Sequence, residues 1–490
     1  MGIDISLYII LAVVIPLLLA PIAAIVPGAI AYFVALIGSI FSFGSIISLM
    51  LGMNAGTKIS YKLGGFAPPV GIEYQANDLN LAIGFLVTFF SLILVIYSYA
   101  SVKKEIEPHK RNVFYSLFLL FLAGIMGIIL TNDFFNLYVF VEIASLAIYS
   151  LIASGRDRKA LASSFQYLIL GTIGATFILI GVGLLYIMTG TLNFTDLAAK
   201  IGHAAETKVV AAAIAFVVIG ILIKTGIFPF HLWMVNSYTY SPSFVSSLMC
   251  GTSSKVMIYV LIKVLFTLFG VTFSLAYLPF DLFLIVIAIL AIIYGAVAAI
   301  YNDDCDKIFA YSSISFLGYI LLAIALGTKA GITAAIVLIF YHALAKVGLF
   351  MANGITFHHH GSASLTNIQG LRKTNPLLAL MYLICAFSII GIPGTAGFIS
   401  KFYLVKSVIS SEAYIPLVVV FLSFGAALFY CWRILEAAYI KKPLKLERFK
   451  LPKTMIISLM FISGLNIYLG VNSSIVINLA ENIARNLVRS

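Results

Sequence analysis

Charged residues are scarce in this chain. Asp, Glu, Lys and Arg together make up 10% of its 490 residues, and hydrophobic residues make up 62%. A soluble protein carries roughly a quarter charged residues. The composition therefore excludes an ordinary soluble protein and predicts a polytopic membrane protein. Because the first apolar run lacks a basic leader, we expect a spanning helix there and not a cleaved signal peptide.

Motifs for cofactor chemistry are also missing. The four cysteines, Cys250, Cys305, Cys385 and Cys431, are far apart and form no Cys-x-x-Cys pair, so thiolate ligation of zinc or an iron–sulfur cluster is not expected. The chain has no Walker-type phosphate loop and no dinucleotide-binding fingerprint. We therefore expect no cofactor, no metal site and no catalytic or redox centre in this chain. A transporter or pump subunit is favoured over a redox enzyme.

Long apolar runs occur along the whole chain. About 20 apolar residues cross the hydrocarbon core as a helix, and by that criterion we expect an all-α fold with about fourteen transmembrane helices. Their approximate positions are 5–26, 29–51, 77–100, 113–131, 134–153, 162–189, 208–235 (broken), 242–269, 281–300, 308–327, 330–352, 376–410 (broken), 414–437 and 454–475.

The basic residues in the expected loops are distributed unevenly. Sixteen lie in loops that follow odd-numbered helices and five in loops that follow even-numbered helices. By the positive-inside rule the first group is cytoplasmic, which places both termini of a multi-pass cell-membrane protein outside. The net charge of +12 is thus an orientation signal and not a nucleic-acid-binding patch. The first group consists of Lys103, Lys104, Lys110, Arg111, Arg156, Arg158, Lys159, Lys307, Arg372, Lys373, Lys441, Lys442, Lys445, Arg448, Lys450 and Lys453.

Four lysines lie well inside expected spans: Lys224, Lys255, Lys346 and Lys401. A charge at the bilayer centre costs about 3 kcal/mol on insertion scales, and intramembrane ionisable residues usually mark ion pathways. We therefore interpret these lysines as functional.

Three other basic residues in the spans, Lys263, Lys406 and Arg433, are nearer span ends. We expect them to extend toward the lipid headgroups. The charged run Lys103–Arg111, which includes Glu105, is also expected to face the headgroups without a special role.

Acidic and histidine residues complete the candidate site. Glu142 is the one acid expected clearly inside the membrane, away from the span ends, either as a relay group or as a structural counter-ion of a lysine. His342 and Lys346 are four residues apart and share one helix face, which favours a relay role for the histidine. For His231, structural and relay roles remain open. The tandem 358–360 histidines are expected in a solvated loop and not at a metal.

Two of the expected helices are interrupted. Gly226 and Pro229 follow Lys224, and Pro393 and Gly394 precede Lys401. A proline inside a helix leaves a backbone carbonyl without its helical partner. The breaks fall in the seventh and twelfth expected helices, which are five helices apart. If a unit of five helices is repeated in tandem, the second copy crosses the membrane in the opposite orientation, because five is an odd number.

Such paired interruptions are typical of inverted-repeat transporters. We expect an N-terminal unit of three helices at 1–111, followed by inverted repeats at 112–270 and 280–437. A cytoplasmic linker and the last helix occupy 438–490.

At these residues the sequence resembles a known family, the antiporter-like subunits of respiratory complex I, Mrp cation/proton antiporters and membrane-bound hydrogenases. The resemblance covers nearly the whole chain and is closest to the D-type Mrp subunit, since the long lateral C-terminal helix of the largest members is missing. One departure is Asp304-Cys-Asp-Lys307, where the family usually has consecutive basic residues. The matching segments are Asn136–Leu151, Phe228–Trp233, Ser241–Ser247 leading to Lys255, Ala310–Ser313, Tyr341–Lys346 with Leu349-Phe350, and Gly397–Lys401.

The resemblance implies a proton or sodium path along the middle of the membrane. Glu142 and Lys224 would be the coupling pair and Lys255 the next relay group. His342 and Lys346 would connect the two halves, and Lys401 would be the terminal lysine. The implied partners are H⁺ or Na⁺, the lipid bilayer and other membrane subunits.

Two versions of this function remain open: an Mrp antiporter, or the pumping module of a redox complex whose electron transfer belongs to other subunits. A stand-alone carrier of an organic solute is the alternative from another class, and an integral membrane enzyme is disfavoured because no acid or metal cluster converges near a water-facing end.

Overall fold

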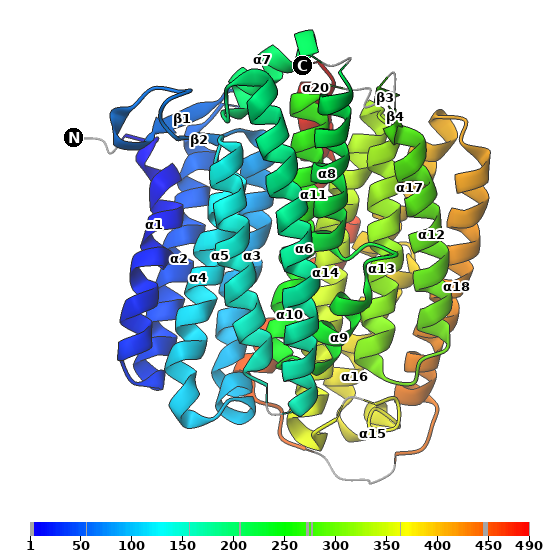
Figure 1. Ribbon diagram of the computed structural model, residues 1–490. Coiled ribbons are helices and arrows are strands. Elements are labelled where there is room, and N and C mark those ends of the chain that lie inside the picture. Colours follow the sequence, from blue (N-terminus) through cyan, green and yellow to red (C-terminus); the bar gives the residue numbers. More distant parts are fainter. Residues whose placement is uncertain are drawn as a thin grey trace.

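The computed structural model describes residues 4–54, 56–155, 157–204, 207–270, 274–275, 278–362, 364–443 and 449–489. Most helices run side by side, nearly parallel to one axis, and the two chain ends lie at the same end of the bundle (Figure 1). Thirteen helices in the described part are long and apolar enough to cross a membrane. They correspond to thirteen of the fourteen expected spans, and the remaining one is divided between two shorter helices.

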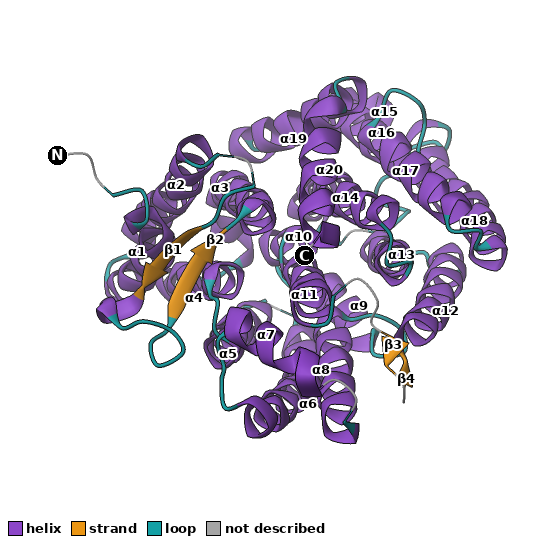
Figure 2. Cartoon of the chain, turned by 90° about the horizontal axis from the view of Figure 1, so that it is seen from above, coloured by secondary structure: helices purple, strands orange, loops and turns teal. Residues whose placement is uncertain are grey.

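The first three long helices are connected to a small hairpin. β1 and β2 pair antiparallel, with Ile59 opposite Ala76 and Lys62 opposite Glu73. The hairpin covers the top of this corner of the bundle (Figure 2). The elements here are α1 (Leu7–Ile25), α2 (Gly28–Gly52), β1 (Ile59–Lys62), η1 (Leu63–Gly65), β2 (Glu73–Ala76) and α3 (Asp78–Glu105).

The next part of the chain contains the first broken helix. Its elements are η2 (Pro108–Lys110), α4 (Arg111–Leu130), α5 (Phe134–Ala153), α6 (Arg158–Thr189), α7 (Phe194–Ala204), α8 (Lys208–Thr225), α9 (Leu232–Tyr240), α10 (Ser243–Gly251), α11 (Ser253–Ile262) and the π-helical turn η3 (Lys263–Leu268). The expected eighth span is confirmed as Ser243–Leu268, and within it Thr252, at φ −124° and ψ −62°, interrupts the helix between α10 and α11.

The last part contains the second broken helix and an unexpected C-terminal helix. Its elements are β3 (Ser274–Leu275), β4 (Leu278–Pro279), α12 (Phe280–Ile300), α13 (Cys305–Ala325), α14 (Lys329–His360), α15 (Leu371–Thr374), α16 (Pro376–Ile390), α17 (Ala396–Ser410), α18 (Tyr414–Tyr439), α19 (Lys453–Val471) and α20 (Ser474–Arg489). The 358–360 histidines form the last turn of α14, so the expectation of a loop there was wrong.

Polar caps explain how the chain reverses with little loop. Asp133 begins α5 only three residues after α4 ends, and its carboxylate accepts a 2.7 Å hydrogen bond from the Asn136 backbone N–H. Such a cap satisfies a donor that the first helical turn leaves free. Asp304 caps α13 in the same way.

The centre of the bundle is α14, whose most apolar 18-residue window is completely buried. Viewed from above, α14 lies inside a ring to which α1, α2, α6, α12 and α18 contribute the rim (Figure 2). The rim helices expose large apolar side chains, such as Leu282, Val286 and Ile293 of α12. Such a surface suits contact with lipid or with other membrane proteins.

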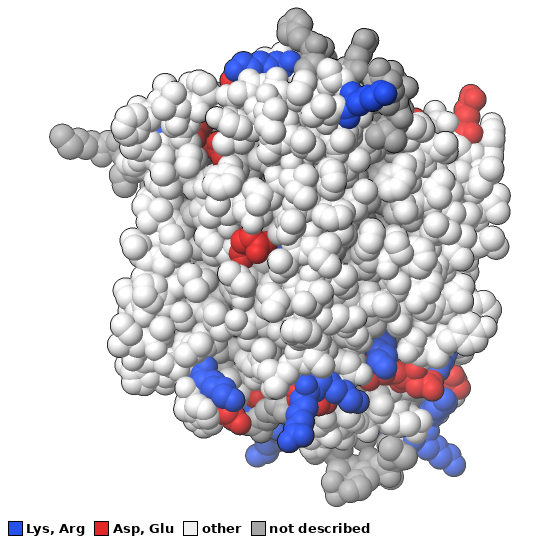
Figure 3. Space-filling model, in the orientation of Figure 1, with Lys and Arg blue, Asp and Glu red and all other residues white. Residues whose placement is uncertain are grey.

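Charge is concentrated at the two ends of the molecule. Figure 3 shows basic side chains mainly around the lower end, a few at the top, and one acidic spot at mid-height on an otherwise uncharged face. Arg156, Lys445 and Arg448, which belong to the basic group expected on one side of the membrane, lie outside the described residues.

Candidate ion-translocation site

An ion pair links α5 and α8 at the first helix break. Lys224 Nζ lies 2.9 Å from Glu142 Oε1 and donates a second hydrogen bond of 2.8 Å to Ser145 Oγ. The Lys224 side chain is 2% exposed and that of Glu142 is 25% exposed. Among the described residues, no other ion pair has a partner this deeply buried.

The backbone around Lys224 is shaped by Gly226. The α8 helix ends at Thr225, and Gly226 adopts φ +77°, a conformation that costs a residue with a side chain about 1–2 kcal/mol. At the break the Ile223 carbonyl accepts a 3.2 Å hydrogen bond from the Gly226 backbone N–H and a second one of 3.0 Å from Trp233 Nε1. Lys224 therefore lies at a helix end that a side chain supports.

The second break repeats this scheme with a lysine as donor. The α16 helix ends at Ile390, and Gly391 and Gly394 have φ values of +85° and +88°. Lys401 Nζ donates a 2.8 Å hydrogen bond to the Ile390 carbonyl. Its ammonium also lies 4.2 Å from the centre of the Phe424 ring, a cation–π contact.

Lys255 and Lys346 lie buried at the centre without a carboxylate within ion-pair distance in the described structure. Lys255 follows the α10–α11 break, and its Nζ donates to the Cys250 carbonyl. Lys346 Nζ donates to the Phe309 carbonyl at 2.8 Å and to the Ser312 hydroxyl. These two lysines are thus held by neutral oxygens. Of the four buried lysines of the candidate site, Lys224 is the one with an acidic partner in the described structure.

The two histidines occupy aromatic surroundings. The His342 ring stacks on Phe316 with centroids 4.5 Å apart, and neither of its ring nitrogens bonds to a described protein group. His342 lies one turn from Lys346 on α14, as expected, and both nitrogens are free to exchange a proton. His231 is buried just before α9 and lies 4.5 Å from the Tyr294 ring.

Lys263 does not extend toward the headgroups as expected. Its side chain is buried, its Nζ donates a 2.5 Å hydrogen bond to the Thr131 carbonyl, and its ammonium lies 4.5 Å from the Phe194 ring. The short helix α7, which was not expected, supplies that ring and covers the end of the span. Lys406, in contrast, is exposed, and Arg433 binds the Ile300 and Asn302 carbonyls and Asp303.

A second buried acid was missed. Glu105 was expected to face the headgroups, but its side chain points inward at the end of α3 and is 7% exposed. Ser101 Oγ and the Ser243 backbone N–H each donate a 2.7 Å hydrogen bond to its carboxylate. The available signal was the spacing of Ser98, Ser101 and Glu105, three and four residues apart, which gives α3 a polar stripe.

Comparison with known proteins shows to which family this fold is similar. Residues 131–428 match the family model described as "NADH:quinone oxidoreductase/Mrp antiporter, TM", and this region contains Glu142 and the four buried lysines of the candidate site. The chain is 34% identical over 437 residues to NADH-quinone oxidoreductase subunit N of Desulforudis audaxviator, covering 88% of this chain and 86% of that protein.

A further relative is the D-type subunit of a Na⁺/H⁺ antiporter from Alkalihalophilus pseudofirmus, which is 30% identical over 72% of this chain and 70% of its own. Among solved structures, a chain of the membrane-bound sulfane sulfur reductase, an archaeal respiratory membrane complex, superposes with a TM-score of 0.91. It is 26% identical, and the match covers 98% of this chain and 97% of that chain.

Proposed function

Because this chain belongs to the NADH:quinone oxidoreductase/Mrp antiporter transmembrane family, we propose that it moves H⁺ or Na⁺ through the cell membrane as one subunit of a larger complex. The relay would consist of Glu142, Lys224, Lys255, His342, Lys346 and Lys401, with His231 as a secondary group. The observation that carries this proposal is the Glu142–Lys224 ion pair at a helix break.

The energy of this pair suits a switch. Two unit charges 4 Å apart interact by about 4 kcal/mol at an effective dielectric constant of 20. Moving one unit charge through 100 mV takes about 2.3 kcal/mol. Opening or closing the pair therefore involves an energy similar to the work of moving one ion. A lysine can also lose its proton in a buried site, whereas an arginine stays charged.

The cavity beside Lys224 supports a small ion over an organic solute. Its volume is about 30 Å³, and Ser145 and Tyr167 contribute to its lining. A space of this size holds one or two water molecules at most. Carriers of organic solutes need a pocket of roughly 300 Å³ or more. The space at the Glu142–Lys224 pair is therefore too small to bind an organic solute.

The two helix breaks support the inverted-repeat organisation. In each, a glycine at positive φ ends a helix and a side chain from the following helix donates to a carbonyl of the last turn, Trp233 in one and Lys401 in the other. We infer that helices at 112–270 and 280–437 form two halves of opposite orientation, each with one such device. The basic lower end of the bundle would be cytoplasmic and both termini outside.

Relatives suggest two kinds of complex. One is named as a subunit of an NADH-quinone oxidoreductase, another as a subunit of a Na⁺/H⁺ antiporter, and the structural relative belongs to a respiratory membrane complex. Purification of the native complex decides between them. Iron–sulfur proteins in the purified complex would mean a pumping module, whereas only small hydrophobic partners would mean an antiporter.

Ion flux in proteoliposomes tests the relay itself. The purified complex is reconstituted, and H⁺ and Na⁺ movements are followed separately. We expect Glu142→Gln and Lys224→Ala to lose coupled translocation although the complex still assembles. Lys208→Ala is the matched control, since Lys208 is exposed at the other end of α8. Wild-type flux in the assembled Glu142→Gln complex would refute the relay.

A further inference from the structure

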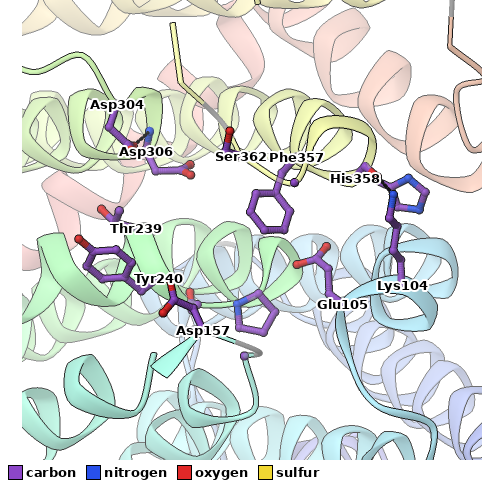
Figure 4. A pocket seen from close by; sticks show the side chains of 14 residues that line it. Lys104, Glu105, Asp157, Thr239, Tyr240, Asp304, Asp306, Phe357, His358 and Ser362 are labelled. Atoms are coloured by element: carbon purple, nitrogen blue, oxygen red, sulfur yellow. Dashed lines mark hydrogen bonds between the residues drawn. The ribbon is translucent and has the colours of Figure 1, made fainter. Parts of the chain in front are cut away.

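The lower end of the bundle contains a cavity of about 560 Å³. Five parts of the chain meet there: the end of α3, the α5–α6 connection, the α9–α10 connection, the start of α13 and the end of α14. Four carboxylates belong to its lining: Glu105, Asp157, Asp304 and Asp306. Figure 4 shows Glu105 and Asp306 reaching into this space from different helices.

The basic group in the lining does not neutralise these acids by an ion pair. Lys104 Nζ donates instead to the His358 backbone carbonyl. Asp304 is used as the cap of α13, where it accepts hydrogen bonds from two backbone N–H groups. Among the described residues, neither Glu105 nor Asp306 has a basic partner within ion-pair distance.

Hydrogen bonds hold both acids in fixed positions. Glu105 accepts from Ser101 and from Ser243, the first residue of α10. Asp306 Oδ1 accepts a 2.6 Å hydrogen bond from Asn353 Nδ2 on α14, and the Tyr382 hydroxyl donates to the other end of that amide at 3.0 Å. Two of the acids that line the cavity, Glu105 and Asp306, are therefore fixed in position by hydrogen bonds from polar groups of their own and neighbouring helices.

This cavity lies close to the buried relay. On α13, Ser312 follows Asp306 by six positions, and the Ser312 hydroxyl contacts Lys346. On α14, Asn353, which binds Asp306, follows Lys346 by seven positions. At 1.5 Å per residue these separations correspond to about 9 and 10 Å. The Phe309 and Phe350 rings, with centroids 5.5 Å apart, come from the turns in between. Along α13 and α14, this aromatic pair thus comes from the turns between the level of Asp306 and that of Lys346.

We propose that this cavity is the inlet by which small monovalent cations enter from the basic face and reach Lys346, with Glu105 and Asp306 as the two acids of entry. The proposal rests on the proposed ion-translocating function and assigns to it a side and a point of entry. Carboxylates in a cleft with low-dielectric walls raise the local concentration of cations there, although the surrounding face is basic. The Phe309–Phe350 pair is the closed position of the path.

Sided transport measurements test this inlet. Glu105→Gln and Asp306→Asn keep the size of each side chain. The new asparagine oxygen can still accept from Asn353, and the new glutamine oxygen can accept from Ser101 or from the Ser243 backbone N–H but not from both. With the cavity side supplying the cation, we expect each variant to need a roughly tenfold higher cation concentration for half-maximal flux, the lower end of the range for electrostatic focusing. With the opposite side supplying the cation, the half-maximal concentration stays at the wild-type value. Runs with a pH gradient in sodium-free buffer, and with Na⁺ at constant pH, show which cation uses the inlet.

Control variants separate an inlet from a structural role. Asp196→Asn removes an acid from α7 at the opposite end and should leave cavity-side flux unchanged. Asp306→Glu restores the charge and should restore the cavity-side dependence. Equal losses from both sides, or wild-type flux from both sides in Glu105→Gln and Asp306→Asn, would overturn the inlet. If those two variants keep wild-type flux while Lys224→Ala is inactive, the inlet alone fails. An active Lys224→Ala complex would overturn the relay and the inlet together.

Discussion

At the scale of single residues, the lysines differ in what neutralises them. Lys224 has a carboxylate at 2.9 Å, whereas Lys346 and Lys401 are held by backbone carbonyls and neutral groups. An unpaired buried ammonium is expensive to keep charged. If the proposed relay operates, a charge passed along it would be most stable at Lys224 while the pair with Glu142 is closed, and opening of the pair would free it to move inward.

Lys346→Arg tests whether proton release matters at the centre. Arginine keeps the positive charge but does not deprotonate in a protein. We expect the variant complex to assemble and to lose nearly all coupled flux. Lys329→Arg, at the exposed start of the same helix, should retain wild-type flux. A Lys346→Arg complex that pumps normally would show that a fixed charge is sufficient there.

At the scale of elements, the sequence predicted the spans and both breaks because apolar length, glycine and proline are local signals. It did not predict the division at Thr252, which lies in a helix without proline. The amphipathic helix α20 and the inward position of Glu105 were also missed, because both depend on what packs against them. Val476, Ala480 and Ile483 of α20 are buried in a helix that packs on α14, a contact between distant parts of the chain.

Trp233→Phe tests the support of the first break. The phenylalanine ring can still stack on Tyr167, whose ring centroid lies 3.7 Å from that of Trp233, but it cannot donate to the Ile223 carbonyl. The Ile223 carbonyl keeps the Gly226 backbone N–H as a donor, so the variant loses one hydrogen bond, which is worth about 0.5–1.5 kcal/mol. We expect a lower melting temperature of the purified complex and weaker coupling. Trp432→Phe is the control because Trp432 is exposed on α18, and an unchanged melting temperature in both variants would contradict this role.

At the scale of the whole molecule, the two ends of the bundle differ in charge and in the cavity that we interpret as an inlet. Both chain ends lie at the end of the bundle opposite that cavity, the N-terminus on the side of α1 and the C-terminus near α7 and α20. The broken helices lie in the two inferred halves, and α14, whose most apolar window is fully buried, carries His342 and Lys346 through the centre of the bundle. This arrangement is consistent with a lateral path that is supplied from the basic face.

Epitope tags test the orientation in intact cells. We expect tags at both termini to bind antibody without permeabilisation, because the positive-inside rule places the basic loops in the cytoplasm. A tag inserted after Lys441, in a basic loop, should bind only after permeabilisation. Terminal tags that are accessible only in permeabilised cells would reverse the orientation and the side of the inlet.

The opening of the Glu142–Lys224 pair can be observed most directly by infrared difference spectroscopy of the working, reconstituted complex. We predict that turnover changes the carboxylate stretching band of Glu142, and that this change disappears in Glu142→Gln and persists in Lys208→Ala. A complex that translocates ions at the wild-type rate while this band stays constant would contradict a pair that opens and closes with each ion.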